Sequence, residues 1–355
     1  MAGASLVYVA CSEEGTVDSL LLGPEGTLTH LDRLHGTAAV RALTVDPQRG
    51  VLYTAQNTVP PVARAFGIEA WTGRLRPWGA AELPETTTYL CIDDRHRRLL
   101  SPSYQGGVIV EVALTQEGNV AGPGKTACAP GPQTHCAEPS PDGRQVYATS
   151  LGTDRIVWWD QASGGAGVPT GQTVVSPGSG PRHLRFNASG NRVYVLNELA
   201  GTVDVFRRDE ANGDLTLVQS VGSIPASWRM PTGIIRTPDR VVEGQKVWCA
   251  DLQLSSSGRY LHTTDRGSST ITTFSVDPQT GILEFIATTA TEVQPRGTAV
   301  TSDGRFLLVC GELSDAVTAY RIDPSTGSLE ATGRAPTGRG PLWMLTLPVG
   351  RAEYT

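Results

Sequence analysis

The sequence has little of what would mark a disulfide framework, a zinc site, a membrane span or a secretory leader. Its six cysteines show no CxxC or other paired spacing, which argues against a disulfide framework and against a zinc site. No run of consecutive apolar residues is long enough to cross a bilayer. The N-terminal stretch has no basic segment ahead of a long apolar one, so we expect no signal peptide. A cytoplasmic protein with reduced cysteines and no membrane partner is the expectation.

Several common kinds of site are also missing. There is no GxSxG, P-loop or GxGxxG motif, which removes the usual sequence support for a serine-hydrolase elbow or a nucleotide-binding loop. The net charge of −6 argues against nucleic acid as a partner. No segment shows the 3.6-residue apolar period of an amphipathic helix, so a barrel of alternating strands and helices is excluded.

What the sequence does contain is turn residues and a long repeat. It has 40 Gly and 24 Pro, which suits a chain full of tight turns. A turn residue followed by a short apolar run, as in Gly190 before NRVYVLNEL, recurs at separations of 46, 46, 47, 47, 68 and 46 residues. The turn residues of the seven units are Ala4, Gly50, His96, Gly143, Gly190, Gly258 and Gly304.

Each unit predicts four strands. Around Gly190 they are residues 184–186, 193–197, 202–208 and 215–221. Four strands in about 45 residues indicate the blade of a β-propeller, in which repetition around an axis leaves only short sheet edges. The fold class is therefore an all-β, seven-bladed propeller. Residues 340–347 resemble an innermost strand and should close the ring against the N-terminal blade. We expect one domain over residues 1–350, a tail over 351–355, and an extra loop within 223–245.

The repeat also predicts which side chains meet at one mouth of the ring. In an antiparallel hairpin, the start of the first strand and the end of the second lie at the same sheet edge. The positions eight residues before and eight after each turn residue should therefore gather there. The earlier positions hold Ala42, Thr88, His135, Arg182, Ala250, Arg296 and Leu342, and the later ones Ser12, Thr58, Tyr104, Leu151, Glu198, Arg266 and Glu312.

This predicted rim is cationic on an acidic protein, which favours an anionic small ligand held by guanidinium groups. His135, in register with two arginines, would be a candidate general base. Two alternatives stay open from the residues themselves. Arg182 and Arg296 could simply form structural ion pairs with Glu198 and Glu312, and the propeller could be a non-catalytic binding scaffold.

Several stretches resemble the seven-bladed propeller lactonases, a family that includes bacterial cycloisomerase-type 6-phosphogluconolactonase and fungal carboxy-muconate lactonizing enzyme. They are THCAEPSPDGRQVY (134–147), GPRHLRFNASGNRVYVLNEL (180–199), ADLQLSSSGRYLHTTDRG (250–267), QPRGTAVTSDGRFLL (294–308) and GRGPLW (338–343). The resemblance covers essentially the whole chain. It implies catalytic roles for His135, Arg182, Glu198 and Arg266.

The resemblance also implies metal-free hydrolysis of a sugar lactone without a cofactor, with 6-phospho-D-glucono-1,5-lactone as the expected substrate. A cycloisomerase acting on a carboxylated muconate is the alternative. The substrate- or phosphate-binding set is Arg296, Glu312 and His183, although the strand position of His183 also suits packing between blades. We expect a small anionic substrate as the partner and a monomer or weak homo-oligomer.

Overall fold

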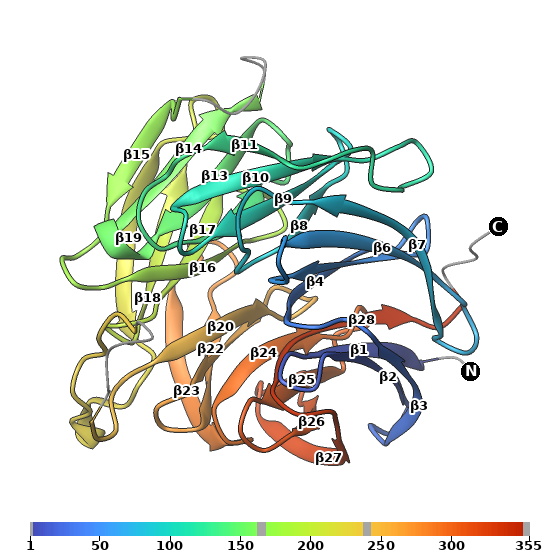
Figure 1. Cartoon of the computed structure of the whole chain (residues 1–355). Coiled ribbons are helices and arrows are strands. Elements are labelled where there is room, and N and C mark those ends of the chain that lie inside the picture. The colour runs from blue at the N-terminus through green and yellow to red at the C-terminus, as the bar shows by residue number, and fades with distance from the viewer. Residues whose placement is uncertain (1–2, 162–167, 237–242, 351–355) are drawn as a thin grey trace.

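The computed structural model describes residues 3–161, 168–236 and 243–350. Its strands form seven antiparallel four-stranded sheets arranged around a ring (Figure 1). The seven-bladed propeller predicted from the repeat is thus confirmed. Apart from strands, the described residues contain two short 3₁₀ helices, η1 (Leu151–Thr153) and η3 (Ala226–Trp228). No helix in these ranges has the length and apolar character of a membrane span.

In six sheets the first strand in sequence is innermost and later strands lie progressively outward, and in the sheet that closes the ring the C-terminal strand is innermost. From the inside outward, the sheets are β28 (Pro341–Pro348), β1 (Ser5–Cys11), β2 (Thr16–Leu22), β3 (Leu28–His35); β4 (Val40–Asp46), β5 (Val51–Gln56), β6 (Val62–Ile68), β7 (Leu75–Glu82); β8 (Cys91–Asp93), β9 (Arg98–Ser103), β10 (Val108–Ala113), β11 (Lys125–Cys128); β12 (Thr134–Pro139), β13 (Gln145–Ser150), β14 (Arg155–Asp160), β15 (Gly171–Val174); β16 (Pro181–Phe186), β17 (Arg192–Asn197), β18 (Thr202–Arg208), β19 (Leu215–Gly222); β20 (Cys249–Leu254), β21 (Tyr260–Asp265), β22 (Thr270–Val276), β23 (Leu283–Ala290); and β24 (Pro295–Val300), β25 (Phe306–Gly311), β26 (Ala316–Ile322), β27 (Leu329–Pro336).

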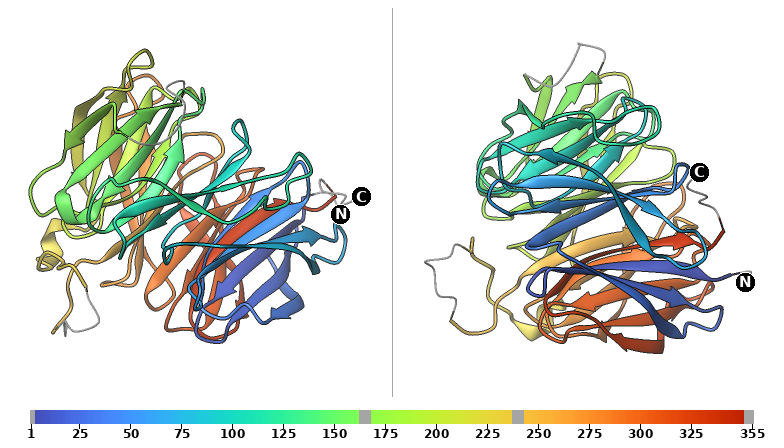
Figure 2. Two further views of the ribbon diagram at one scale, coloured as in Figure 1. Left: turned by 45° about the horizontal axis from the view of Figure 1, so that its top comes forward. Right: turned by 45° about the vertical axis from the view of Figure 1, so that its right-hand side comes forward.

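The C-terminal strand closes the ring as predicted. β28 pairs antiparallel with β1, with Ser5 opposite Pro348 and Ala10 opposite Trp343. The first and last described strands therefore lie side by side, as the blue and red strands of Figure 2 show. The single domain over residues 1–350 stays a prediction, and the tail predicted over 351–355 lies outside the described residues.

Neighbouring blades are held together by apolar packing and by tyrosine hydroxyls. Tyr53 Oη and Tyr147 Oη each donate, at 2.6 Å, to a turn carbonyl of the next blade, that of Gly118 and Gly213 respectively. These tyrosines are fully buried. Because water does not reach their hydroxyls, each one needs a hydrogen-bond partner in the protein. These contacts between neighbouring sheets fix the positions of the innermost strands relative to one another.

Register irregularities interrupt six of the innermost strands near their first residues. In four of these strands, β4, β12, β16 and β24, a β-bulge leaves an arginine or a histidine between two register-paired neighbours. Bulges bend a strand and turn the extra side chain in a new direction, and they often occur beside functional sites. The residues left between paired neighbours are Arg41 in β4, His135 in β12, Arg182 in β16 and Arg296 in β24.

Candidate active site

A cavity of about 250 Å³ opens at the end of the ring where these bulges lie. It is small, near the lower end of the size range for ligand pockets. The bulges of β4, β12 and β24 supply part of its lining, and the connections after β9, β17 and β21 supply another part. Its polar lining includes Arg41, Asn57, Thr88, Tyr104, His135, Glu198, Arg236, Trp248, Arg266 and Arg296.

Glu198 is the centre of a buried charge cluster at this cavity. Arg182 Nε lies 2.8 Å from Glu198 Oε2, and Arg266 Nη2 donates to the same oxygen at 2.9 Å. Trp248 Nε1 donates to Oε1 at 3.2 Å. The three charged side chains are each at most 6% exposed. One carboxylate therefore holds two guanidiniums, and the cluster keeps a net positive charge.

The orientation of the Arg266 side chain is fixed by the Trp248 ring. Its Cζ lies 3.6 Å from the centroid of the Trp248 ring, and Arg236 Cζ lies 3.3 Å from the same centroid. The indole is an electron-rich surface for such cations. Burial lowers the pKa of Arg266 to about 9, although Glu198 acts in the opposite direction. A guanidinium held this rigidly, at a cavity wall, can stabilise negative charge without rearranging.

His135 lies beside this cationic group in a neutral state. Burial, followed by the positive charges of Arg182 and the proximity of His183, lowers the pKa of His135 well below its usual value of 6.5. Its Nδ1 is buried and has no hydrogen-bond partner among the described residues. Tyr104 meets the imidazole edge-on, with the ring centroids 6.0 Å apart. A neutral imidazole at a cavity wall can accept a proton from a bound water.

The structure brings most of the predicted site residues to the cavity. His135, Glu198, Arg266 and Arg296 line it. Glu312 stands next to Arg296, whose Nη1 lies 3.4 Å from Glu312 Oε2.

Arg182 and His183 lie deeper. Arg182 is 1% exposed and does not line the cavity, but its guanidinium supports Glu198 and donates to the carbonyl oxygen of Ala250. His183 is turned away from the cavity, and its Nδ1 lies 2.9 Å from Asp251 Oδ1. Its contacts are those of a residue packed between blades. Substrate binding by His183 stays a prediction, and His183 does not line the cavity.

Two cavity residues, Arg41 and Asn57, were missed because counting from the turn glycine is off by one in their blade. The rim positions predicted there, Ala42 and Thr58, are wrong, since Ala42 is in the hydrophobic core and Thr58 is not part of the lining. In this blade β5 starts directly after the turn glycine, whereas β17 starts two residues after Gly190.

Counting from the tyrosine of the second strand removes the error. Arg41 lies twelve residues before Tyr53, as His135 lies twelve before Tyr147. Arg182 likewise lies twelve before its blade's tyrosine, Tyr194.

Trp248 and Arg236 were missed for a different reason. They belong to, or directly follow, the extra segment predicted within residues 223–245, which has no counterpart in the other units. Part of that segment, residues 237–242, lies outside the described ranges. The described part contributes Arg236 to the cavity, so it helps to form the mouth.

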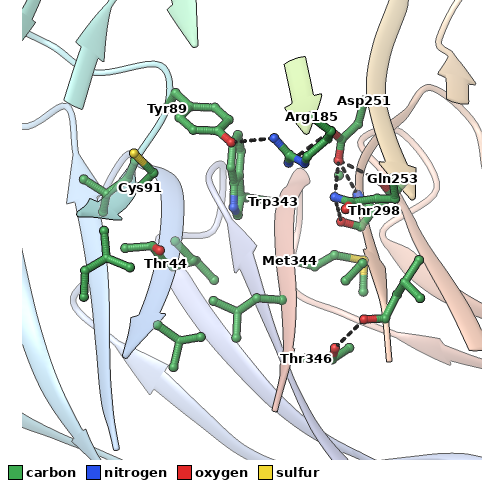
Figure 3. Close-up of a pocket in the computed structure, with 18 of the residues that line it drawn as sticks. Thr44, Tyr89, Cys91, Arg185, Asp251, Gln253, Thr298, Trp343, Met344 and Thr346 are labelled. Atoms are coloured by element: carbon green, nitrogen blue, oxygen red, sulfur yellow. Dashed lines mark hydrogen bonds and ion pairs between the residues drawn. The ribbon is translucent and has the colours of Figure 1, made fainter. Parts of the chain in front are cut away.

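A second cavity, of about 400 Å³, lies farther along the same innermost strands (Figure 3). On β12, for example, Glu138 lines it, whereas His135 lines the first cavity. Its guanidinium, Arg185, donates to Tyr89 Oη at 2.8 Å and to Glu138 Oε1 at 3.0 Å, and it lies 3.9 Å from Asp251. Two carboxylates outnumber one guanidinium, so this end disfavours an anion. The first cavity is the better site for an anionic ligand.

Metal binding has no obvious place in this arrangement. Across the described ranges, no three His, Cys, Asp or Glu side chains come together as a potential metal site. The charged side chains that line the first cavity are four arginines and one glutamate, and this excess of positive charge is unfavourable for holding a metal ion.

The buried histidines predict a loss of stability in mild acid. Burial lowers the pKa of His183 to about 3 and that of His262 to about 4, and it lowers the pKa of His135 as well. Unfolded histidines take up protons near pH 6.5, whereas these stay neutral in the native state, so protons favour unfolding. The stabilisation that comes from keeping these histidines neutral is fully present above pH 6.5, and it is lost as the pH falls. We expect His183 and His262 each to cost about 2 kcal/mol of unfolding free energy between pH 6.5 and 5, and His135 to act in the same direction.

Urea denaturation at pH 7.5 and 5.0 would measure this loss. The variant His262→Gln should show a smaller decrease than the wild type, because His262 is remote from the cavity and its own proton uptake is removed. His35→Gln, at an exposed position, should leave the decrease unchanged. Equal pH dependence in the wild type and His262→Gln would contradict the expectation.

Comparisons with known proteins agree with this geometry. The family model described as "Lactonase, 7-bladed beta-propeller" matches residues 7–346. A 6-phosphogluconolactonase of Serratia proteamaculans is 32% identical, covering 96% of this chain and 98% of the relative. One from Cronobacter sakazakii is also 32% identical, covering 96% and 97%. The solved periplasmic gluconolactonase PpgL of Pseudomonas aeruginosa is 26% identical with a TM-score of 0.84, covering 98% and 99%.

The match extends over almost the whole ring, including the bulged strands that carry Arg41, His135 and Arg296. Both comparisons cover nearly the whole of each chain. By its fold, its repeat and this full-length similarity, the chain belongs to the seven-bladed β-propeller lactonase family.

Proposed function

We propose that the chain hydrolyses 6-phospho-D-glucono-1,5-lactone to 6-phosphogluconate, as a cytoplasmic enzyme of the pentose phosphate pathway acting as a monomer or weak homo-oligomer. The observation that carries the proposal is a buried, neutral His135 beside Arg266 in a cavity with excess positive charge. Lactone hydrolysis needs a base for water and a cation for the developing oxyanion. The full-length relatives named 6-phosphogluconolactonase support the substrate.

The residues fit a simple reaction sequence. His135 takes a proton from water as its oxygen attacks the lactone carbonyl carbon, and Arg266 stabilises the negative charge on the former carbonyl oxygen. The bond between that carbon and the ring oxygen then breaks, and the ring oxygen receives the proton from His135. The product is the open-chain acid, which ionises in water.

Glu198 has a positioning role in this sequence. Oε2 contacts Arg182 and Arg266, and Oε1 accepts from Trp248. Since both oxygens already have partners, the carboxylate is better suited to hold Arg266 in place than to transfer a proton to the leaving oxygen.

The test is turnover by the purified protein. Hydrolysis of 6-phosphoglucono-1,5-lactone would be compared with the spontaneous reaction and with carboxy-cis,cis-muconate cyclisation under the same conditions. We expect acceleration with the lactone and none with the muconate. Muconate turnover alone would favour the cycloisomerase, and no turnover of either would favour a binding scaffold.

A further inference from the structure

Four arginines at or beneath the cavity divide into two groups, each around one carboxylate. Arg182 and Arg266 share Glu198 at short distances. In the second group, Arg296 reaches Glu312 only at 3.4 Å, and burial together with the nearby positive charge of Arg296 lowers the pKa of Arg41. The second group is therefore held less tightly than the first.

Arg41 is the least compensated of these groups. It lines the cavity and is partly buried, yet it has neither a hydrogen bond nor an ion pair to any residue in the described ranges. Burial, together with repulsion from Arg296, lowers the pKa of Arg41 to about 10, although Glu312 acts in the opposite direction. A guanidinium that faces a cavity without a partner is costly unless a ligand supplies the missing anion.

Arg41 comes from a different blade than the groups at the reacting end of the substrate. The reacting end is defined by His135 and by Arg266, which is held by Glu198. Arg41 comes from β4 and Arg266 from the connection after β21, and the charged groups that influence Arg41 are Arg296 and Glu312, followed by Arg182. A ligand whose lactone carbonyl meets His135 and Arg266 can therefore place a second anionic group at Arg41 and Arg296.

We propose that Arg41, together with Arg296, binds the phosphate of the substrate and makes the enzyme prefer a phosphorylated lactone over the same lactone without phosphate. This inference rests on the proposed function. Arginine suits the task because its planar fork donates two parallel hydrogen bonds to a phosphate. An unphosphorylated lactone would leave both guanidiniums in the cavity without an anion, and the site would bind it less well.

The bulge in β4 is what makes this possible. Arg41 is the residue left between the paired residues Val40 and Ala42. Without the bulge, the strand would alternate regularly, and its side chain would take a different direction. Asn57, at the end of the partner strand, donates to the carbonyl oxygen of Thr87 at 3.0 Å and so fixes the adjoining wall.

The experiment compares two substrates in one set of variants. Arg41→Met keeps an apolar stem of similar length and removes the charge. We expect kcat/KM for 6-phosphoglucono-1,5-lactone to fall roughly 10- to 100-fold, mainly through KM, as for a lost hydrogen bond to a charged group. For glucono-1,5-lactone, kcat/KM should change by less than about threefold. Arg41→Lys should recover part of the lost activity, because lysine keeps the positive charge but cannot donate two parallel hydrogen bonds as a guanidinium does.

Controls make the outcomes distinguishable. Arg74→Met removes a guanidinium that is 58% exposed and pairs with Asp32, and it should affect neither substrate. Calorimetric titration with inorganic phosphate, on proteins checked for unchanged melting temperature, reports the subsite independently of turnover. We expect weaker phosphate binding in Arg41→Met.

Equal losses on both lactones, or unchanged phosphate binding in Arg41→Met, would overturn the role of Arg41. If the wild type hydrolyses neither lactone but loses phosphate affinity in Arg41→Met, the proposed reaction is wrong and the anion subsite stands. If Arg41→Met does not fold, Arg41→Gln and Arg41→Lys provide the same comparison.

Discussion

Replacing His135 with glutamine is expected to lower kcat for 6-phosphoglucono-1,5-lactone by roughly 10²- to 10⁴-fold, the usual contribution of a general base. The side chain is buried, its Nδ1 has no protein partner in the described ranges, and burial keeps its pKa below the usual value. It is therefore in the proton-accepting form at neutral pH. KM should change little, because the arginines that bind the anion remain. Initial rates, corrected for spontaneous lactone opening, would measure the effect.

His262→Gln is the matched control for this variant. His262 is also a buried histidine whose pKa is lowered by burial, but it lies on β21 and contacts Thr273 rather than the cavity. Its replacement should leave kcat within about twofold, a negligible free-energy difference. If His135→Gln keeps its full kcat while remaining folded, His135 is not the base.

Replacing Glu198 with glutamine is expected to destabilise the protein by about 3–5 kcal/mol, the usual result when one partner of a buried charge cluster is removed. Arg182 and Arg266 would lose the carboxylate oxygen that they share at 2.8 and 2.9 Å. Urea denaturation would measure the loss. Because an anion can take the place of the carboxylate, phosphate should raise the melting temperature of this variant more than that of the wild type.

Glu312→Gln provides the comparison. Its carboxylate lies farther from its partner, at 3.4 Å from Arg296, and both side chains are partly accessible, so we expect a smaller loss of stability. A Glu198→Gln variant as stable as Glu312→Gln would contradict the view that Glu198 neutralises a buried pair of guanidiniums.

The ring and its closure could be predicted from the sequence because hairpins repeat at a nearly constant spacing. The spacing fixes strand order within a blade, and the same pattern near residue 340 identifies the closing strand. The register argument also placed His135, Glu198, Arg266 and Arg296 at one cavity, since strand pairing sets which ends meet.

Three features could not be predicted in the same way. Arg41 was missed because a turn one residue shorter moves the glycine relative to the strand. The strand position of His183 did indicate packing between blades, but the bulge before it, which sets its direction, is not revealed by the hydrophobic pattern. Trp248 and Arg236 come from the unit with the extra segment, where no repeat exists to supply a register. In each case a local irregularity decides where a functional side chain points.

The most direct measurement is a crystal structure of the protein with 6-phosphogluconate, the product of the proposed reaction. The account predicts that the product lies in the cavity of about 250 Å³, with its carboxylate at His135 and Arg266 and its phosphate at Arg41 and Arg296. Product bound instead in the cavity beside Arg185, or with its phosphate at Arg266 and its carboxylate at Arg41, would contradict the account.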